Sequence, residues 1–273
     1  MPTAVAIQSL VASKDSGSLY AIYVIAGDLP GKDVAFLESL GTEGCKIRCI
    51  LASTTRFEAF RHTQQLTQSL VSVVALLKFE LTNLLREDKV LYLDGDILVR
   101  EDLSALYSTD VSSYYLAACL DSTNMYVKRD AAYCMDDYFN SGIMLLNLRR
   151  VREDNVPMRL LRQKESLADV SLMDQNVLNL VMTGHVRQLP LRYNVMALNL
   201  ERQKGAWSME QLNAYYGTSY ASLEEVKADA AIVHFASRDK PWKVPVGTLQ
   251  EEWLECLAQL VRSHPCDASL GFL

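Results

Sequence analysis

The sequence has no long uninterrupted hydrophobic stretch, few glycines and prolines, and no excess of basic residues. A membrane-spanning helix needs about 18 consecutive apolar residues, and the richest run, residues 70–77, is far shorter and contains a serine. The 12 glycines and 7 prolines exclude a collagen-like or low-complexity chain. The 27 basic and 33 acidic residues give a net charge of −6, which argues against a dedicated nucleic-acid binder. We therefore expect a globular protein that binds no nucleic acid.

Cysteines and targeting signals are also sparse. The six cysteines stand at positions 45, 49, 119, 134, 256 and 266, and the close spacing of the first two matches no common zinc motif. Disulfide frameworks belong mainly to small secreted domains. A secretory signal begins with basic residues, and the segment before Lys14 carries none. The sequence therefore predicts free thiols in a cytoplasmic protein.

Apolar runs of strand length alternate with helical patterns along the chain, without internal repeats or a linker. The predicted strands are 19–25, 46–51, 90–93, 115–120, 143–148, 186–189 and 230–234. The predicted helices are 33–40, 66–85, 101–107, 150–163, 172–182, 208–216, 223–227 and 248–261. This alternation predicts an α/β fold, and the unbroken apolar run at 90–93 is typical of a parallel strand covered on both faces. Ligands of such sheets bind beyond the carboxyl ends of the strands.

Two aspartates flank a glycine where the apolar run 90–93 ends, in the order Asp94, Gly95, Asp96. Carboxylates this close repel each other unless a cation joins them. Mg²⁺ and Mn²⁺ commonly bind one or two carboxylates together with substrate phosphates, and Gly95 lets the backbone turn sharply beside a ligand. The alternative is an ordinary turn between two strands, but the position at a strand end favours a metal site.

A histidine and a lysine follow a second apolar strand far downstream. His234 ends the run 230–234, and Lys240 precedes Pro241, which stiffens the loop. A histidine after a strand is often structural, whereas a lysine in a stiff loop beside a metal suits a phosphate group. Together, two carboxylates, one imidazole and one lysine predict a site for a metal-bound diphosphate.

Four segments together resemble glycosyltransferase family 8, in the family's order. They are YLDGDILV around Asp94, FNSGIMLLNL at 139–148, LMDQNVLN at 172–179 and HFASRDKPW from His234, and VAIQSL at 5–10 resembles the family's first helix. The family includes bacterial lipopolysaccharide α-galactosyl- and α-glucosyltransferases and glycogenin. The resemblance implies a GT-A-type fold with a mostly parallel central sheet flanked by helices. It implies one glycosyltransferase domain, 1–273, in which 248–273 form a C-terminal helix and a short tail.

The resemblance also implies an activity. A hexose, galactose or glucose, would pass from a UDP-sugar to a glycan or lipid-linked acceptor with retention at the anomeric carbon, and the ion would be Mn²⁺, with Mg²⁺ as the alternative. A front-face displacement fits best, because the leaving phosphate can take the acceptor's proton and a neutral amide is a weak nucleophile. The implied setting is lipopolysaccharide biosynthesis in the cytoplasm or at the inner face of the membrane. The short, weakly charged C-terminus does not favour membrane contact.

Site residues carried over from the resemblance fall into three groups. The implied metal ligands are Asp94, Asp96 and His234. The implied catalytic pair, under the anomeric carbon, is Asp174 and Gln175. The implied donor-binding residues are Lys78, Asp94, Gly95, Asp96, Asp121, Asn140, Ser141, Ser237 and Lys240. On the residues alone, Asn140 is equally compatible with a turn, and Asp174 with the first turn of a helix, where acids are favoured.

The chain departs from the family pattern at three places. The family's first strand and its uridine-binding loop would precede VAIQSL, and their absence predicts an unpaired sheet edge and a poor nucleotide pocket. Leu77 stands where the family often has Arg, so we expect Lys78 to supply the charge without an arginine's planar fork. Ser237 stands where the family usually has Gly. Three alternatives stay open: an N-terminally truncated, weakly active or inactive relative, a metal-dependent hydrolase, and a pure interaction module.

Overall fold

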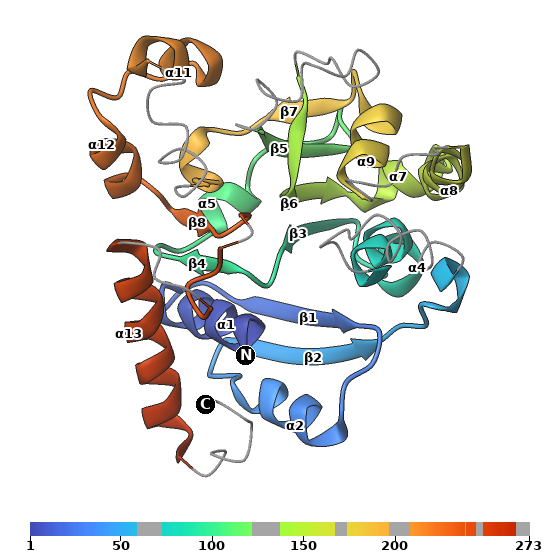
Figure 1. Ribbon diagram of the computed structural model, residues 1–273. Coiled ribbons are helices and arrows are strands. Elements are labelled where there is room, and N and C mark those ends of the chain that lie inside the picture. Colours follow the sequence, from blue (N-terminus) through green and yellow to red (C-terminus); the bar gives the residue numbers. More distant parts are fainter. Residues whose placement is uncertain are drawn as a thin grey trace.

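Strands and helices alternate in the computed structural model of the chain (Figure 1), which describes residues 1–58, 73–121, 137–166, 174–196, 208–237, 239–243 and 248–265. The strands are β1 (Tyr20–Ala26), β2 (Cys45–Leu51), β3 (Lys89–Leu93), β4 (Ile97–Val99), β5 (Leu116–Leu120), β6 (Phe139–Asn147), β7 (Val186–Gln188) and β8 (Ile232–His234). The α-helices are α1 (Pro2–Ala12), α2 (Gly31–Ser39), α4 (Leu81–Leu84), α5 (Ser104–Tyr107), α7 (Leu148–Glu153), α8 (Val156–Ser166), α9 (Gln175–Met182), α11 (Met209–Tyr216), α12 (Leu223–Ala228) and α13 (Thr248–Ser263). Three 3₁₀-helices complete the described elements: η1 (Thr55–Phe57), η2 (Val73–Glu80) and η4 (Leu191–Tyr193). The predicted α/β class is confirmed.

The described strands form three groups, ordered β1–β2, β3–β6–β5–β7 and β4–β8. Strands β1–β2 and β5–β7 are parallel, whereas β6 runs antiparallel to β3 and to β5, and β4 runs antiparallel to β8. The expectation of a mostly parallel sheet is therefore corrected to a mixed one. The apolar run of β3 did not reveal its direction, because an apolar strand can pair in either orientation. The expectation that both faces of β3 are covered is also wrong, since all five of its residues are partly exposed.

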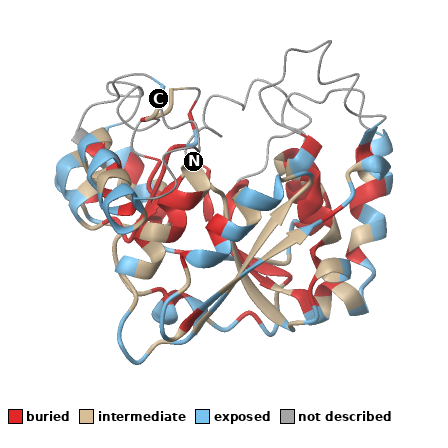
Figure 2. Ribbon diagram, turned by 90° about the horizontal axis from the view of Figure 1, so that it is seen from below, coloured by how far each residue is buried: buried red, intermediate tan, exposed pale blue. Residues whose placement is uncertain are grey.

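Strands β1 and β3 each have an unpaired edge in the part of the chain that the structure describes. There β1 pairs with β2 alone and β3 with β6 alone. All five residues of β3 are partly exposed, and β1 shows almost the same pattern, whereas every residue of β5 is buried. Figure 2 shows strands of intermediate exposure, in tan, alongside buried segments, in red. Side chains of a strand point alternately to the two faces of a sheet, so partial exposure along the whole of β3 means that neither of its faces is fully covered. That an absent first strand leaves such an edge stays a prediction.

Two predicted helices differ from the observed ones. The helical pattern at 66–85 lies partly outside the described residues, and its remainder forms η2 followed by the single turn of α4. The predicted helix 150–163 is broken into α7 and α8, because Asn155 adopts a positive φ of 50°, a conformation that asparagine tolerates better than most residues. The other predicted elements in the described residues begin and end within a few positions of the observed ones.

Helices cover both sides of the strands and form the core with them. Trp253 of α13 packs in one cluster with Val5 of α1 and Val233 of β8, while Phe57 and Leu76 pack in another cluster with Met144 of β6. Among the described helices, none combines the length and the apolar character needed to cross a bilayer. The cysteines in the described part of the chain, Cys45, Cys49, Cys119 and Cys256, are free thiols.

Candidate metal and donor site

Backbone pairing brings residues from distant parts of the sequence to one place. Strand β3 ends at Leu93, and the next three residues form the turn into β4. Strand β8 pairs with β4 so that His234 lies opposite Ile97. The backbone N–H of Phe235 then donates to the carbonyl of Asp96 at 2.9 Å. These bonds place the imidazole beside the turn that carries both aspartates, as the sequence predicted.

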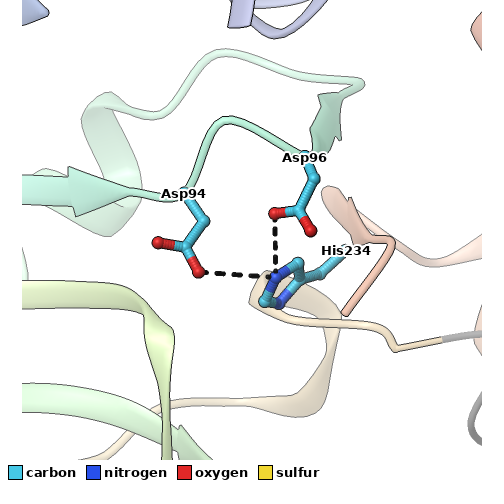
Figure 3. Close-up of side chains that lie close together, drawn as sticks. All are labelled: Asp94, Asp96 and His234. Carbon is cyan, nitrogen blue, oxygen red and sulfur yellow. Dashed lines mark ion pairs between the residues drawn. The ribbon is translucent and has the colours of Figure 1, made fainter. Parts of the chain in front are cut away.

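The three side chains point toward one another (Figure 3). Nε2 of His234 lies 3.3 Å from Oδ1 of Asp96 and 3.8 Å from Oδ2 of Asp94. One ligand atom from each residue falls within 4.8 Å of the others. The histidine is buried, whereas the carboxylates keep 30% and 21% of their side-chain surface exposed. Two carboxylates and one imidazole facing a partly open site form a donor set that fits a divalent ion such as Mn²⁺.

Gly142 makes this close approach feasible. A Cβ at this position would lie 2.2 Å from Cε1 of His234 and 2.9 Å from Oδ2 of Asp94, closer than real Cβ atoms come. Its carbonyl also accepts a hydrogen bond from the backbone N–H of Asp94 at 2.7 Å. Gly142 was not predicted as a site residue, although a glycine inside a strand often marks such a close approach.

Two lysines and a tyrosine surround the carboxylates. Nζ of Lys240 lies 2.5 Å from Oδ2 of Asp96 and also donates to the carbonyl of Phe235. Nζ of Lys78 lies 3.4 Å from Oδ1 of Asp94, on the opposite side of the pair. The hydroxyl of Tyr92 donates to the same Oδ1 at 2.7 Å. Oδ1 of Asp94 is thus held by the protein, while Oδ2 faces the histidine.

The two aspartates differ in acidity because their surroundings differ. Burial raises the pKa of Asp94, and the nearby Lys78 only partly offsets this effect. Burial acts in the same direction on Asp96, but the charges of His234 and Lys240 outweigh it and hold the pKa of Asp96 well below its usual range. Burial would also lower the pKa of Lys78, but Asp174 and Asp94 raise it well above the ordinary value. Lys78 and Asp96 therefore carry charge at neutral pH.

A second group of buried polar side chains lies next to the cluster. Oδ2 of Asp121 accepts from Nδ2 of Asn140 at 3.1 Å and from Nε2 of Gln175 at 2.7 Å. Oε1 of Gln175 accepts from the backbone N–H of Ser141 at 3.0 Å. The Ser141 hydroxyl in turn donates to Oδ2 of Asp174 at 3.0 Å. The structure therefore brings together the residues that the sequence placed near the donor sugar and the anomeric carbon.

Two of the predicted donor-binding residues make local contacts within the chain, and their role toward the donor stays a prediction. The hydroxyl of Ser237 donates to the carbonyl of Asp239 at 2.8 Å, within its own turn. Gly95 faces α1, where a Cβ would lie 2.7 Å from Oγ1 of Thr3. The close packing against Thr3 explains why a glycine stands at position 95 without any contact to a ligand.

Three further site residues were missed by the sequence reasoning. They are Tyr92, Gly142 and Asn194, whose side-chain oxygen lies 2.9 Å from Nδ1 of His234. Tyr92 could have been found, because residues two apart on a strand share a face and Asp94 follows it by two. A lone asparagine in a loop carries no such signal.

The other histidines in the described residues are engaged elsewhere. The ring of His185 packs on Tyr115 with centroids 4.5 Å apart, and His264 packs edge-on against Phe36 at 5.9 Å. The remaining one, His62, lies outside the described residues. Within the described part of the site, His234 is therefore the sole imidazole, and it faces the carboxylates. This arrangement weighs against a hydrolase that uses a separate histidine as its base.

Residues 1–244 match the sequence profile of glycosyl transferase family 8. The chain belongs to this family. Among its relatives, a probable glycosyl transferase Gly of Streptococcus gordonii is 26% identical over 90% of this chain and 36% of its own length. A lipopolysaccharide 1,2-glucosyltransferase of Escherichia coli is 29% identical over 58% of this chain and 45% of its own length. The family-8 chain thus spans less than half of these two relatives.

Solved structures of the family show the same fold. An active-site mutant of LgtC superposes with a TM-score of 0.76 at 25% identity, covering 94% of this chain and 91% of that one. The galactosyltransferase LgtC, solved in complex with donor and acceptor sugar analogues, gives a TM-score of 0.75 at the same identity. GlyE of Streptococcus pneumoniae, at 22% identity, matches with a TM-score of 0.68 over 96% of this chain and 59% of that one. This family-8 chain therefore has the GT-A fold.

Proposed function

We propose that this protein transfers a hexose, galactose or glucose, from a UDP-sugar to a glycan or lipid-linked saccharide, with retention at the anomeric carbon. The proposal depends on a divalent ion, Mn²⁺ with Mg²⁺ as the alternative. Its main support is the convergence of Asp94, Asp96 and His234 beside a buried group of polar residues suited to a sugar. Family membership and the likeness to LgtC, which was solved with donor and acceptor sugar analogues, support the same reaction class.

In this proposal the two aspartates and the histidine would hold the divalent ion. The ion would supply Lewis-acid stabilisation of the negative charge that develops on the leaving phosphate. Lys240 reaches this region from the opposite side of Asp96, and its ammonium adds a second positive charge there. Fixed charges aimed at a developing charge are usually the largest contribution to catalysis.

The buried polar group binds and orients the sugar. Asp121 and Asn140 offer a carboxylate and an amide to the sugar hydroxyls, and both are at least nine-tenths buried. Buried polar groups discriminate strongly between sugars. A sugar that lacks the matching hydroxyl leaves one of these groups without a hydrogen-bond partner. The choice between galactose and glucose rests on such contacts.

The chemistry is best described as a front-face displacement. The bond between C1 and the diphosphate oxygen breaks while the acceptor oxygen bonds to C1 on the same face. The hydroxyl proton passes to a phosphate oxygen of the departing UDP. Gln175 is not needed as a nucleophile, since its Oε1 already accepts from Asn140 and from the backbone N–H of Ser141. Asp174 is paired with Lys78 at 2.6 Å. In this proposal neither Asp174 nor Gln175 attacks C1; Asp174 supplies a fixed negative charge below C1, and Gln175 keeps the neighbouring groups in position.

Donor turnover tests this proposal. Purified protein is incubated with UDP-galactose, UDP-glucose and other UDP-sugars, with Mn²⁺ or with a chelator, and release of UDP is measured. We expect release with one hexose donor in Mn²⁺ and its loss on chelation. Asp96→Asn should lower the rate by ~10²-fold or more, since a metal contributes several kcal/mol to the transition state.

Two further measurements sharpen the result. Asp88→Asn serves as the control, because Asp88 is an exposed carboxylate paired with Arg152 at 3.5 Å and should leave the rate unchanged. Calorimetric titration with UDP and Mn²⁺ separates an active enzyme from a weakly binding relative. Metal-independent turnover, or undiminished turnover by Asp96→Asn, would count against the proposal.

The acceptor and location are part of the same proposal. The Escherichia coli relative is described as a lipopolysaccharide glucosyltransferase, which favours a lipid-linked saccharide as the acceptor. We place the reaction in the cytoplasm or at the inner face of the membrane on the basis of the family resemblance and the free thiols. We also expect residues 1–273 to act as one domain with 248–273 as its C-terminal helix and tail.

A further inference from the structure

Asn194 connects the cluster of metal-ligand atoms to the buried polar group beside it. Its side-chain oxygen lies 2.9 Å from Nδ1 of His234, and its side-chain nitrogen donates to Oδ1 of Asn140 at 2.9 Å. The residue has no exposed surface. The two ends of one amide therefore join two groups that the sequence assigned separately to metal and sugar.

The backbone holds Asn194 firmly in this position. It follows directly after η4, and the next residue, Val195, forms an isolated bridge with Val233 of β8. The N–H of Val195 donates to the carbonyl of Ile232, and the N–H of His234 donates to the carbonyl of Val195, both at 3.0 Å. Asn194 and His234 are thus fixed to each other through two backbone bonds.

The orientation of the Asn140 and Asn194 side-chain amides follows from neighbouring groups that can only donate or only accept a hydrogen bond. The backbone N–H of Gly142 can only donate, and it lies 3.0 Å from Oδ1 of Asn140. The other end of the Asn140 amide lies 3.1 Å from an oxygen of Asp121, which accepts when ionised. The group of Asn194 that contacts Oδ1 of Asn140 must therefore be its NH₂, and its carbonyl oxygen must face His234.

This orientation decides the tautomer of the histidine. A carbonyl oxygen only accepts, so Nδ1 of His234 must carry the hydrogen. Nε2 is then the ring nitrogen that is left to bind a metal, and it is the atom that faces Asp94 and Asp96. The ring is thus oriented so that Nε2 is the nitrogen available to a metal.

We propose that Asn194 is a positioning residue with two separable effects. Its oxygen fixes His234 in the Nδ1–H tautomer, and its NH₂ holds Asn140 in the orientation that serves the donor sugar. The first effect concerns metal binding alone, whereas the second rests on the proposed glycosyl transfer.

The tautomer can be measured directly in metal-free protein. Two-bond ¹H–¹⁵N correlation spectra distinguish a ring nitrogen that bears hydrogen from one that bears a lone pair. His234→Gln identifies the resonances among the four histidines. We expect hydrogen on Nδ1 of His234 in the unsubstituted protein, and a lone pair on Nδ1 would overturn the proposal.

Two substitutions separate the two effects. Asn194→Ala removes both contacts, so we expect mixed tautomers and ~10- to 100-fold weaker Mn²⁺ binding in calorimetry without UDP, as for other groups that orient a ligand histidine. Asn194→Asp keeps an acceptor for Nδ1–H but places an oxygen against Oδ1 of Asn140. It should bind Mn²⁺ at least as well as the unsubstituted protein, while its affinity for the active UDP-hexose falls ~10-fold relative to UDP.

Asn213→Ala is the matched control. Its amide also donates and accepts, at 2.8 Å to the carbonyl and 2.9 Å from the N–H of Tyr220, so it should leave metal and sugar binding unchanged. Unchanged tautomer and Mn²⁺ affinity in a folded Asn194→Ala would overturn the proposal. If that variant does not fold, Asn194→Asp decides: equal losses of metal and sugar binding, or no loss of either, contradict it. The tautomer and Mn²⁺ results need no turnover, so a failure of the proposed function stays distinguishable.

Discussion

The ammonium nitrogen of Lys78 lies 2.6 Å from Oδ2 of Asp174, and their side chains are only 5% and 7% exposed. Ser141 donates to the same carboxylate oxygen, so the charge of Asp174 is met by an ion pair and a hydrogen bond. The sequence offered Lys78 as a replacement for a missing arginine. In the structure it links Asp174 to Asp94 across the site, which makes it a counter-charge for two carboxylates at once.

The first prediction concerns the stability contributed by this pair. Lys78→Met leaves a buried carboxylate without its cation, and breaking a buried pair from one side typically costs ~3–5 kcal/mol of unfolding free energy. The double variant Lys78→Met/Asp174→Asn should cost less than the sum of the two single changes, because it removes both charges. Chemical denaturation measures each term.

The exposed pair Arg149–Glu153 is the control for this cycle. Its side chains are 70% and 60% exposed at a separation of 3.0 Å, so Arg149→Ala should leave the unfolding free energy almost unchanged. If the loss of unfolding free energy in the double variant equals the sum of the losses in the two single variants, Lys78 and Asp174 are not coupled. The role of Lys78 as the counter-charge of Asp174 would then be wrong.

The second prediction isolates the hydroxyl of Tyr92. Burial and the charge of Asp94 raise the pKa of Tyr92 well above its usual value, so its hydroxyl keeps its proton and donates to Asp94. Tyr92→Phe keeps the ring, over which Nζ of Lys78 lies 4.9 Å from the centroid. We expect ~10- to 100-fold weaker Mn²⁺ binding in calorimetry, because the ligand carboxylate loses its orienting donor.

Tyr107 provides a matched control for that substitution. Its hydroxyl donates to the carbonyl of Lys89 at 2.9 Å, and Nζ of Lys89 lies 4.9 Å from its ring centroid. Tyr107→Phe therefore removes the same kind of hydroxyl outside the metal-ligand cluster and should leave Mn²⁺ affinity unchanged. Equal effects of the two substitutions would show that Tyr92 has no special role.

The third prediction concerns Gly142. Gly142→Ala places a methyl group against the His234 ring and Asp94, both of which the surrounding backbone holds in place. We expect ~1–3 kcal/mol of lost stability from overpacking and loss of measurable Mn²⁺ binding. Gly31→Ala is the control, since a Cβ there meets open space. A Gly142→Ala variant that binds Mn²⁺ normally would contradict the geometry of the cluster.

Much of the site was predictable because strand ends are visible in a sequence. Asp94 and His234 each follow or end an apolar run, and such ends gather at one edge of an α/β sheet. The pairing of β4 with β8 was not predictable, because β4 is a three-residue strand without a clear pattern. Yet this pairing places His234 opposite Ile97.

The parts that could not be predicted depend on tertiary context. The run 73–85 has apolar residues at helical spacing, but spacing does not distinguish an α-helix from the 3₁₀-helix of η2. The direction of β6 is equally hidden, since its residues are buried on both faces in either orientation. Asn194 acquires its role only through Val195, whose backbone bonds to β8 are invisible in sequence.

The last prediction concerns Lys240, which the sequence assigned to the diphosphate. Its ammonium contacts Asp96 at 2.5 Å and lies 5.9 Å from the ring centroid of Trp242. Lys240→Met removes a cation from the proposed phosphate site, and a hydrogen bond to a charged group is worth ~1.5–3 kcal/mol. UDP binding in Mn²⁺ should therefore weaken ~10- to 100-fold. Binding of Mn²⁺ alone should be no weaker, because the variant removes a positive charge that repels the ion.

Calorimetry of both titrations separates the effects, and Lys243→Met, at an exposed position three residues further on, should change neither. Parallel losses of Mn²⁺ and UDP affinity in Lys240→Met would instead show that Lys240 maintains the shape of the ligand cluster, and its assignment to the diphosphate would be wrong.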